Sequence, residues 1–341
     1  MPETPLVTAS LITYNHARYI EQAVKSVLAQ QTNFPFELVI GEDESSDGTR
    51  EIVQRLAAAH PDRIRLNLHS RASNLSYGGR PTGRHNYVTN IRSARGKYIA
   101  TLDGDDYWTD PQKLQRQVDL LESRPDCAVC FSLCQYVDED GADLGVGADV
   151  PNPQPSFTLD DLLERRFIAS TATVMFRRGL FGDFPEWYFQ CPVGDFPMLV
   201  MNAQHGDIAF LDRVTAAYRI HPAGIWSMGL KHTEWSEKTR AQQERQAKRW
   251  RSMGVLYGFL DRHLGTAHRP IVRRRIAEFA KSEGSCHRWL GDRPALRRCL
   301  WAAAKAEASI SPTRAWRSLQ LILRSYTHPM EGVKAEPQAV E

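Results

Sequence analysis

Short apolar runs alternate with amphipathic segments over the first 137 residues. Five apolar, β-branched runs have the length and composition of buried strands: 6–13, 36–43, 63–69, 97–103 and 127–137. Three segments between them repeat apolar residues at helical spacing: 16–30, 45–60 and 110–123. This order predicts an α/β fold, Rossmann-like, with a mostly parallel sheet and helices on both faces.

The pattern changes in the second half of the chain. Residues 141–157 are rich in Gly and Pro and predict a loop. After it we expect a short helix, a strand at 170–176, a helix from Asp195 to about His205, and two short strands ending near Ile220. The remaining strong signals are helical. We therefore expect three parts: an α/β domain at 1–230, a basic helical region at 231–326 and a disordered tail at 327–341.

Charge separates the same parts, although the net charge of the 341 residues is only +3. Residues 231–341 carry a net charge of +11 and residues 1–230 a net charge of −8. Arg clusters mixed with Leu, Trp and Phe suit a helix lying on an anionic membrane. There are two alternatives to membrane binding. The basic helices could form a cap with a solvated basic face, or they could make a domain or subunit contact that balances the negative charge of residues 1–230.

The sequence also bears on cellular location. The six cysteines are scattered, and Cys127 and Cys130 lie in an apolar run typical of a buried strand, so no disulfide framework is expected. The first 15 residues lack the pattern of a signal peptide, and no window is long and apolar enough for a membrane span. We expect a cytoplasmic protein, with the inner face of the cell membrane as an alternative place.

Polar residues follow three of the predicted strands at the point where each ends. They are Thr13-Tyr14-Asn15, Glu42-Asp43-Glu44 and Asp103-Gly104-Asp105-Asp106. Ligands of parallel α/β sheets bind beyond the carboxyl ends of the strands, so these clusters should converge. Because converging carboxylates repel one another, a divalent cation or a ligand is expected to neutralise them.

The turn after the first strand excludes one kind of nucleotide site. A dinucleotide-binding Rossmann domain holds pyrophosphate on a G-x-G-x-x-G turn, whereas this turn reads LITYNHARYI and has no glycine. A metal at residues 103–106 is the substitute, since hard oxygen ligands suit Mg²⁺ or Mn²⁺ bridging to a diphosphate.

Five motifs occur in the order and at the separations typical of one enzyme family. They are SLITYNHARYIEQAVKSVLAQ, ELVIGEDESSDGT, RHNYVTNIRSARGKYIATLDGDDYWTDPQKL, GDFPMLVMNAQHG and AAYRIHPAGIWS. The chain resembles family 2 glycosyltransferases of the GT-A fold over roughly residues 5–226. The resemblance implies an inverting glycosyltransferase that moves a sugar from a nucleotide-sugar donor, with UDP-sugars favoured, to a glycan, lipid-linked or small-molecule acceptor.

The resemblance also implies roles for individual residues. Tyr14 would stack on the base, Asp43 would read a uracil-like N3–H, Asp103 would approach the ribose and Asp195 would be the catalytic base. The implied nucleotide-sugar-binding set is Thr13, Tyr14, Asn15, Asp43, Arg84, Asn86, Asp103, Gly104 and Asp105. The implied Mn²⁺ or Mg²⁺ site has the ligands Asp105, Asp103 and His221. The implied supporting residues are Glu42, Asp106 and Arg219.

Two positions depart from the family pattern, and each role has a structural alternative. Glu42-Asp43 stands where the family often has Asp-Asp, and Gly194-Asp195 where it often has Glu-Asp, which leaves acceptor geometry less defined. Structural alternatives exist for six of these residues: a helix cap or turn for Asp105, a solvated loop charge for Asp43, a core position for Tyr14, an N-cap for Asp195, simple packing for His221 and a structural acid partner for Arg219.

Three other functions compete with sugar transfer. A sugar-nucleotide pyrophosphorylase would carry a Gly-rich basic loop after the first strand, and an inactive relative would only bind sugar nucleotides. A nucleic-acid-binding protein could use the basic C-terminal region, but the acidic clusters argue against it because phosphate backbones attract Lys and Arg. We therefore expect no nucleic-acid partner.

Overall fold

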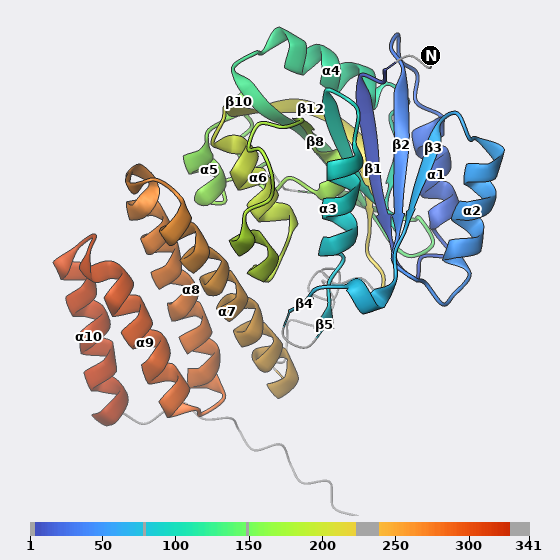
Figure 1. Ribbon diagram of the computed structural model, residues 1–341. Helices are drawn as coiled ribbons and strands as arrows, with labels where there is room; N and C mark the ends of the chain where they lie inside the picture. Colours follow the sequence, from blue (N-terminus) through green and yellow to red (C-terminus); the bar gives the residue numbers. More distant parts are fainter. Residues whose placement is uncertain (1–3, 78–79, 148–149, 223–238, 328–341) are drawn as a thin grey trace, which may run out of the picture. The chain divides into compact units, whose positions relative to one another are not determined.

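The computed structural model describes residues 4–77, 80–147, 150–222 and 239–327 (Figure 1). Contacts divide the chain into two compact units, one of residues 1–190 and 194–231 and the other of residues 191–193 and 232–341. The boundary expected at residue 230 and all but the first residue of the expected tail lie outside the described residues, so the division into domains stays a prediction.

The first unit is built on a mixed sheet with the strand order β10-β12-β8-β11-β6-β1-β2-β3. The pairs β6–β1, β1–β2, β2–β3 and β12–β8 are parallel, whereas β11 runs antiparallel between β6 and β8. The expectation of an α/β fold with a mostly parallel sheet is confirmed. The strand bounds are β1 (Val7–Thr13), β2 (Phe36–Glu42), β3 (Ile64–Leu68), β6 (Tyr98–Asp103), β8 (Cys127–Val137), β10 (Ser156–Phe157), β11 (Met175–Arg177) and β12 (Asp207–Arg219).

The strand order reverses direction beside β1. The chain runs from β1 outward to β2 and β3, then returns to β6 on the other side of β1. Right-handed crossovers therefore place α1 (Ile20–Leu28) and α2 (Thr49–Ala59) on one face and α3 (Arg84–Ser93) on the other, as Figure 1 shows. Such a reversal opens a crevice beyond the carboxyl ends of the two strands, here β1 and β6.

Two asparagines of α3 hold this helix against the sheet. The side-chain amide of Asn86 donates to the Gly41 carbonyl at 2.8 Å, and that of Asn90 donates to the Leu11 carbonyl at 2.9 Å. Helix and strand approach so closely that a Cβ added at Gly41 would lie 1.6 Å from the Asn86 Oδ1 atom. A glycine is therefore required there, because any side chain would push α3 away from β2.

Four local expectations were wrong or incomplete. The 141–157 segment contains β9 (Asp143–Val146) and β10, and these pair with longer strands that supply the hydrogen-bond partners. The strand expected at 170–176 is a 3₁₀ turn at Thr171–Thr173 followed by β11. The two strands expected near Ile220 are one strand, β12, interrupted by irregular register. Helix α3 was not expected, because its buried polar residues hide its apolar face.

The remaining elements of the first unit surround the sheet. They are β4 (Ser76–Tyr77), β5 (Arg80–Pro81), β7 (Tyr107–Trp108), α4 (Lys113–Ser123), α5 (Leu159–Leu163) and α6 (Asp195–Ala203), with 3₁₀ turns at Arg71–Ser73 and Glu186–Gln190. Strand β7 pairs with β12 through Trp108 and Ala216. The loop after β6 is thereby joined to the carboxyl half of β12.

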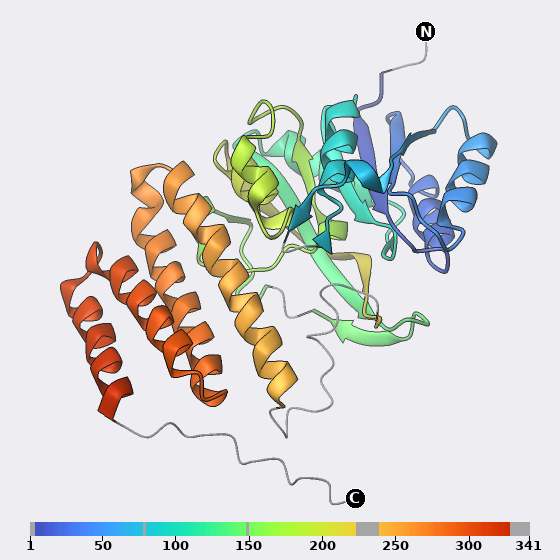
Figure 2. The ribbon, with the colours of Figure 1, turned by 60° about the horizontal axis from the view of Figure 1, so that its bottom comes forward.

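The second unit is helical, as expected. Helices α7 (Arg240–His263), α8 (Arg269–Trp289), α9 (Arg293–Ala308) and α10 (Pro312–Thr327) follow one another, and each packs on the next (Figure 2). Thr239 and Gln242 form a capping box at the start of α7, and Trp250 of α7 stacks on Phe279 of α8. Among the described helices, none combines the length and apolarity that crossing a bilayer would need.

Candidate active site

The loops after β1 and β2 are locked together by side-chain hydrogen bonds. Asn15 adopts a φ of 55°, in the left-handed region, and its Oδ1 accepts from the Ser46 backbone N–H at 2.9 Å. Its own N–H donates to the Ser45 hydroxyl at 2.9 Å. Glu42 is buried, accepts from the Ser45 N–H at 2.6 Å and is paired with Arg50. In this structure Asn15 and Glu42 shape the loops that carry Tyr14 and Asp43.

Asp43 follows the end of β2, and its two carboxylate oxygens differ in their contacts with the described residues. Its Oδ2 accepts from the Asn74 side chain at 2.6 Å and lies 3.5 Å from Arg71 Nη1. Its Oδ1 is buried and accepts no hydrogen bond from the described residues. A buried carboxylate oxygen with no partner is costly, so this atom suits a donor on a ligand.

Tyr14 is exposed beside Asp43. Its side chain is 37% exposed, which removes the core alternative, and the Arg71 guanidinium lies 3.8 Å from its ring centre. Arg71 thus contacts both Tyr14 and Asp43. An exposed aromatic ring next to an unpartnered carboxylate oxygen is the arrangement that a planar base with an N–H donor would fit.

Asp105 lies between two histidines. His221 Nε2 is 3.1 Å and His16 Nε2 is 3.6 Å from the same Asp105 Oδ2 atom. The other nitrogen of His16 is 3.2 Å from the Thr13 hydroxyl. Gly104 makes this possible, because a Cβ at that position would lie 2.5 Å from Thr13 Oγ1. The ends of β1, β6 and β12 therefore meet at Asp105.

The pKa values of Asp103, Asp105 and Asp106 are shifted in different directions. Burial, followed by the charges of Asp105 and Asp195, raises the pKa of Asp103 to about 8. Burial and the charges of Asp105 and Asp103 raise the pKa of Asp106 well above its usual range. Burial also acts to raise the pKa of Asp105, but the His221 hydrogen bond and the charge of His16 outweigh it, so that pKa is lowered. Asp105 is the carboxylate that stays ionised without a ligand.

Arg219 holds the Asp105 loop against the end of β12. Its Nε donates to the Asp105 carbonyl at 3.0 Å, and its backbone N–H donates to Asp106 Oδ1 at 2.8 Å. Its other nitrogens donate to the Asp138 and Glu139 carbonyls and to the Gln22 side chain. The guanidinium thus contacts backbone carbonyls and an amide oxygen, and it positions the loop through them. Asp106 Oδ2, in contrast, is buried and accepts no hydrogen bond from the described residues.

Asp195 is the first residue of α6 and is exposed. Gly194 occupies the N-cap position, and Asp195 Oδ1 accepts the N–H of its neighbour Phe196 at 2.8 Å. The carboxylate is close enough to Asp103 to contribute to the raised pKa of that residue. The structure thus brings Asp195 near the carboxyl end of β6, and Asp195 is not the residue at the N-cap.

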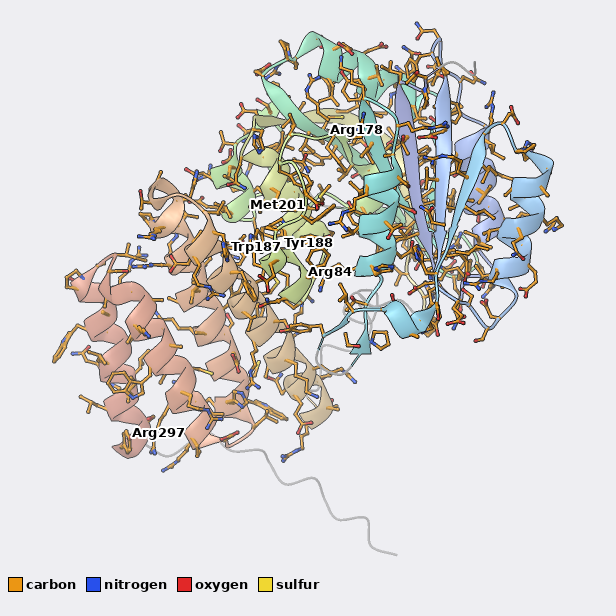
Figure 3. All side chains as sticks on the ribbon, viewed as in Figure 1. Arg84, Arg178, Trp187, Tyr188, Met201 and Arg297 are labelled. Atoms are coloured by element: carbon orange, nitrogen blue, oxygen red, sulfur yellow. The ribbon has the colours of Figure 1, made fainter. Side chains whose placement is uncertain are left out.

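Arg84 and Asn86 occupy buried positions at the start of α3. Arg84 Nη1 donates to the Phe189 carbonyl at 2.7 Å, and its guanidinium lies 5.8 Å from the Tyr188 ring (Figure 3). Asn86 is bound to Gly41, as described above. Both residues connect elements around the site, and contact of either with a donor stays a prediction.

Two side chains in this region, His16 and Arg71, were not predicted from the sequence. His16 directly follows the Thr13-Tyr14-Asn15 cluster, and that adjacency was the available signal for it. Arg71 lies in a 3₁₀ turn far from Tyr14 and Asp43 in the sequence, and no local pattern connects it with them. Its place depends on the pairing of β2 with β3, which brings the loop after β3 beside the loop after β2.

A hollow of about 430 Å³ lies away from these carboxylates, at the amino end of β1. Its lining includes Arg95, Lys97 and Arg178, the last of which is labelled in Figure 3. Arg95 pairs with Glu37 and Lys97 with Glu122 at 2.6 Å each. Because Arg95 and Lys97 are already paired with carboxylates, we do not connect this hollow with the site around Asp103 and Asp105.

Solved structures share the fold. Staphylococcus aureus TarS, residues 1–349, superimposes with a TM-score of 0.60 at 17% identity and covers 94% of this chain and 88% of its own. It has also been solved with UDP. The mannosyltransferase PcManGT of Pyrobaculum calidifontis, solved with GDP-Man and Mn²⁺, has a TM-score of 0.52 at 20% identity, covering 95% and 82%. At these identities the likeness establishes the GT-A fold.

Sequence comparison gives the family. An uncharacterized protein of Mycobacterium bovis is 34% identical over 245 residues, which are 69% of this chain and 63% of that protein. The alignment thus spans less than two thirds of the relative's length. The family model described as glycosyl transferase family 2 matches residues 9–184, more than half of the chain. The resemblance read from the motifs is confirmed: this chain belongs to glycosyl transferase family 2.

Proposed function

We propose that the protein transfers a sugar from a nucleotide-sugar donor, with UDP-sugars favoured, to a hydroxyl of a glycan, lipid-linked or small-molecule acceptor. The observation that carries the proposal is the grouping of polar residues at one edge of the sheet. Asp43 and Tyr14 lie at the ends of β2 and β1, Asp103 and Asp105 at the end of β6, and Asp195 acts electrostatically on Asp103. Crowded carboxylates favour binding of a cation, and acceptor atoms without hydrogen bonds favour a ligand that donates hydrogen bonds.

The donor-binding part of the proposal rests on Asp43 and Tyr14. The free Oδ1 of Asp43 can accept the N3–H of uracil while the base lies against the exposed Tyr14 ring. Similar structures have been solved with UDP-GlcNAc and with GDP-Man, so this fold accommodates nucleotide sugars of both kinds. A hydrogen bond from the uracil N3–H to Asp43 Oδ1 would favour UDP over CDP, because cytosine has no N–H at this position.

Mn²⁺ or Mg²⁺ fits the donor atoms around Asp105. The oxygen and nitrogen ligands available here are Asp105 Oδ2 and the Nε2 atoms of His16 and His221. Asp106 Oδ2, which is buried and accepts no hydrogen bond from the described residues, belongs to the adjacent residue. Oxygen and nitrogen atoms of these kinds can bind a divalent cation. Asp105 and His221 would hold the ion, with Asp103 and His16 beside them. When bound, the ion supplies positive charge that stabilises the leaving diphosphate.

Asp195 is the proposed general base. An acceptor hydroxyl is a poor nucleophile, so its proton must leave as its oxygen bonds to the anomeric carbon. In the proposed step, that proton passes to the Asp195 carboxylate while the bond from the anomeric carbon to the diphosphate oxygen breaks. The nucleoside diphosphate leaves with the electron pair, and attack from the opposite side inverts the carbon. Asp195 is exposed at the start of α6, where an acceptor can reach it.

An inactive sugar-nucleotide binder and a pyrophosphorylase-type enzyme are the alternatives. The loop after β1 has no Gly-rich basic segment, and its residues are bound to the loop after β2. This argues against a pyrophosphorylase. Release of nucleoside diphosphate from a nucleotide sugar in the presence of an acceptor separates an enzyme from a binder, and we expect release that depends on the acceptor.

Base recognition by Asp43 predicts a specific loss in Asp43→Asn. A hydrogen bond to a charged group contributes about 1.5–3 kcal/mol, so UDP binding should weaken about 10- to 100-fold. Cytosine has no N3–H, so CDP binding should change little in the same variant. Calorimetric titration of both nucleotides with Mn²⁺ measures the difference, and a thermal melt checks that the variant is folded. An unchanged preference for UDP over CDP would remove Asp43 from base recognition.

Membrane association is proposed for the helical unit. On α10, Trp316 and Leu323 are 59% and 63% exposed and lie seven residues apart, on one face, with Arg317 and Arg324 next to them in sequence. Insertion of each apolar side chain contributes about 1.5–3 kcal/mol, and the arginines attract anionic lipid.

Liposome flotation tests this association. The protein should float with anionic vesicles but not with zwitterionic ones, and Trp316→Ser with Leu323→Ser should stay at the bottom. The exposed pair Leu144 and Val146 on β9, changed to Ser, is the matched control. Failure of the unmodified protein to float would favour a helical cap.

A further inference from the structure

The helical unit contains a buried cluster of three metal-binding side chains. Glu283 and His287 lie four residues apart on one face of α8, and Cys299 faces them from α9. One ligand atom from each, a carboxylate oxygen, an imidazole nitrogen and a thiol sulfur, lies within 4.8 Å of the other two. All three residues belong to the second unit, whereas Asp43, Asp103, Asp105 and Asp195 belong to the first.

His287 has no hydrogen bond to the described residues, although both ring nitrogens are buried. Nε2 lies 3.5 Å from Glu283 Oε1, and Nδ1 lies 3.6 Å from Asp292 Oδ2. Both distances exceed those of a good hydrogen bond. Buried imidazole nitrogens without partners are costly, so this ring is unusual unless something binds to it.

The backbone brings Cys299 close to α8. Gly284 follows Glu283, and a Cβ added to it would lie 3.2 Å from the Cys299 Cβ. The absence of a side chain at Gly284 thus lets the thiol approach the carboxylate. Burial, followed by the charge of Glu283, raises the pKa of Cys299 to about 12, so without a cation this sulfur keeps its proton.

We propose that Glu283, His287 and Cys299 form a zinc site that clamps α8 to α9. Carboxylate oxygen, imidazole nitrogen and cysteine sulfur are the three kinds of ligand that Zn²⁺ takes in proteins. Binding releases the thiol proton to solvent and leaves one position for water. Asp292 faces the Nδ1 side of the ring and orients His287, as carboxylates do beside zinc-bound histidines. Arg251, 2.7 Å from Glu283 Oε1, orients the carboxylate.

Cobalt titration of the full chain distinguishes this site from the site around Asp105. Co²⁺ replaces Zn²⁺ and gives an intense near-ultraviolet thiolate charge-transfer band only when sulfur is a ligand. The cluster of Asp105, His16 and His221 has no sulfur and gives no such band. We expect the band to saturate at one equivalent and Zn²⁺ to abolish it.

Matched variants make the assignment specific. Cys299→Ser should lose the band, whereas Cys286→Ser, which changes another buried cysteine of the same unit, should keep it. Asp292→Asn retains a good N-cap for α9 but removes the carboxylate, and it should bind Zn²⁺ about 10- to 100-fold more weakly. Zn²⁺ should also raise the melting temperature of the full chain, and this rise should be smaller in Cys299→Ser. No band in the unmodified protein, or a band that survives Cys299→Ser, would overturn the proposal.

Discussion

Replacing Asp195 with asparagine is expected to lower sugar transfer about 10²- to 10⁴-fold while leaving donor binding unchanged. A positioned general base contributes that range to the rate, and asparagine keeps the shape of the side chain but cannot accept the proton. Donor binding should persist because Asp195 acts on the acceptor, whereas Asp43 and Asp105 belong to the donor side. Initial rates at saturating donor, together with calorimetric titration of the nucleoside diphosphate, measure the two effects separately.

The matched control is Asp62→Asn, an exposed carboxylate in the turn before β3. It should leave rate and binding unchanged. Normal turnover in Asp195→Asn would show that the base is another residue. Loss of donor binding along with the rate would place Asp195 on the donor side, contrary to the proposal.

Replacing Asp105 with alanine is expected to remove metal-dependent donor binding. Asp105 is the carboxylate kept ionised by His221 and His16, and loss of a direct ligand should cost more than the about 10- to 100-fold typical of an outer partner. His16→Ala should have a smaller effect than His221→Ala, because its nitrogen is 3.6 Å rather than 3.1 Å from Asp105. Titration of UDP with and without Mn²⁺ measures each variant.

EDTA separates the metal from the side chain. Unmodified protein in excess EDTA should bind UDP as weakly as Asp105→Ala does with Mn²⁺, and EDTA should weaken that variant no further. Asp62→Ala should behave as the unmodified protein. Full activity of the unmodified protein in excess EDTA would contradict the assignment of a divalent cation to Asp105.

Crowded carboxylates at the end of β6 are tolerated because neighbouring groups offset them in different ways. Arg219 holds the loop through backbone carbonyls, and two histidines lower the pKa of Asp105. Burial raises the pKa of Asp103 to about 8 and the pKa of Asp106 well above its usual range. A cation entering the site would change this balance, since a nearby positive charge favours the ionised form of each carboxyl group.

The sequence predicted the part of the fold that depends on local periodicity and parallel pairing. Strands β1, β2 and β6 are short apolar runs, and the polar residues after them meet because parallel strands end at the same edge. Thr13, Glu42 and Asp103 are each the last residue of their strands. The requirement for glycine at position 41, just before Glu42 on β2, could not be predicted from the sequence, because it arises from the packing of Asn86, 45 residues away.

Long-range pairing accounts for what the sequence did not predict. Helix α3 buries Arg84, Asn86 and Asn90, so its pattern of apolar residues is weak. The Gly- and Pro-rich segment 141–157 forms strands only because β8 and β12 offer free edges. Arg71 meets Tyr14 through tertiary structure alone. The zinc cluster joins two helices, and the i, i+4 spacing of Glu283 and His287 was its one local signal.

In the proposed complex, Asp43 and Asp105 bind opposite ends of one nucleoside diphosphate, with a divalent cation at Asp105. Crystals grown with UDP and Mn²⁺ test it directly, because manganese is located by its anomalous scattering. We expect an anomalous peak at a manganese ion bound to Asp105, with the uracil N3 atom in hydrogen-bonding distance of Asp43 Oδ1 and the uracil ring against Tyr14. Manganese bound elsewhere, or a nucleotide away from the ends of β1, β2 and β6, would contradict it.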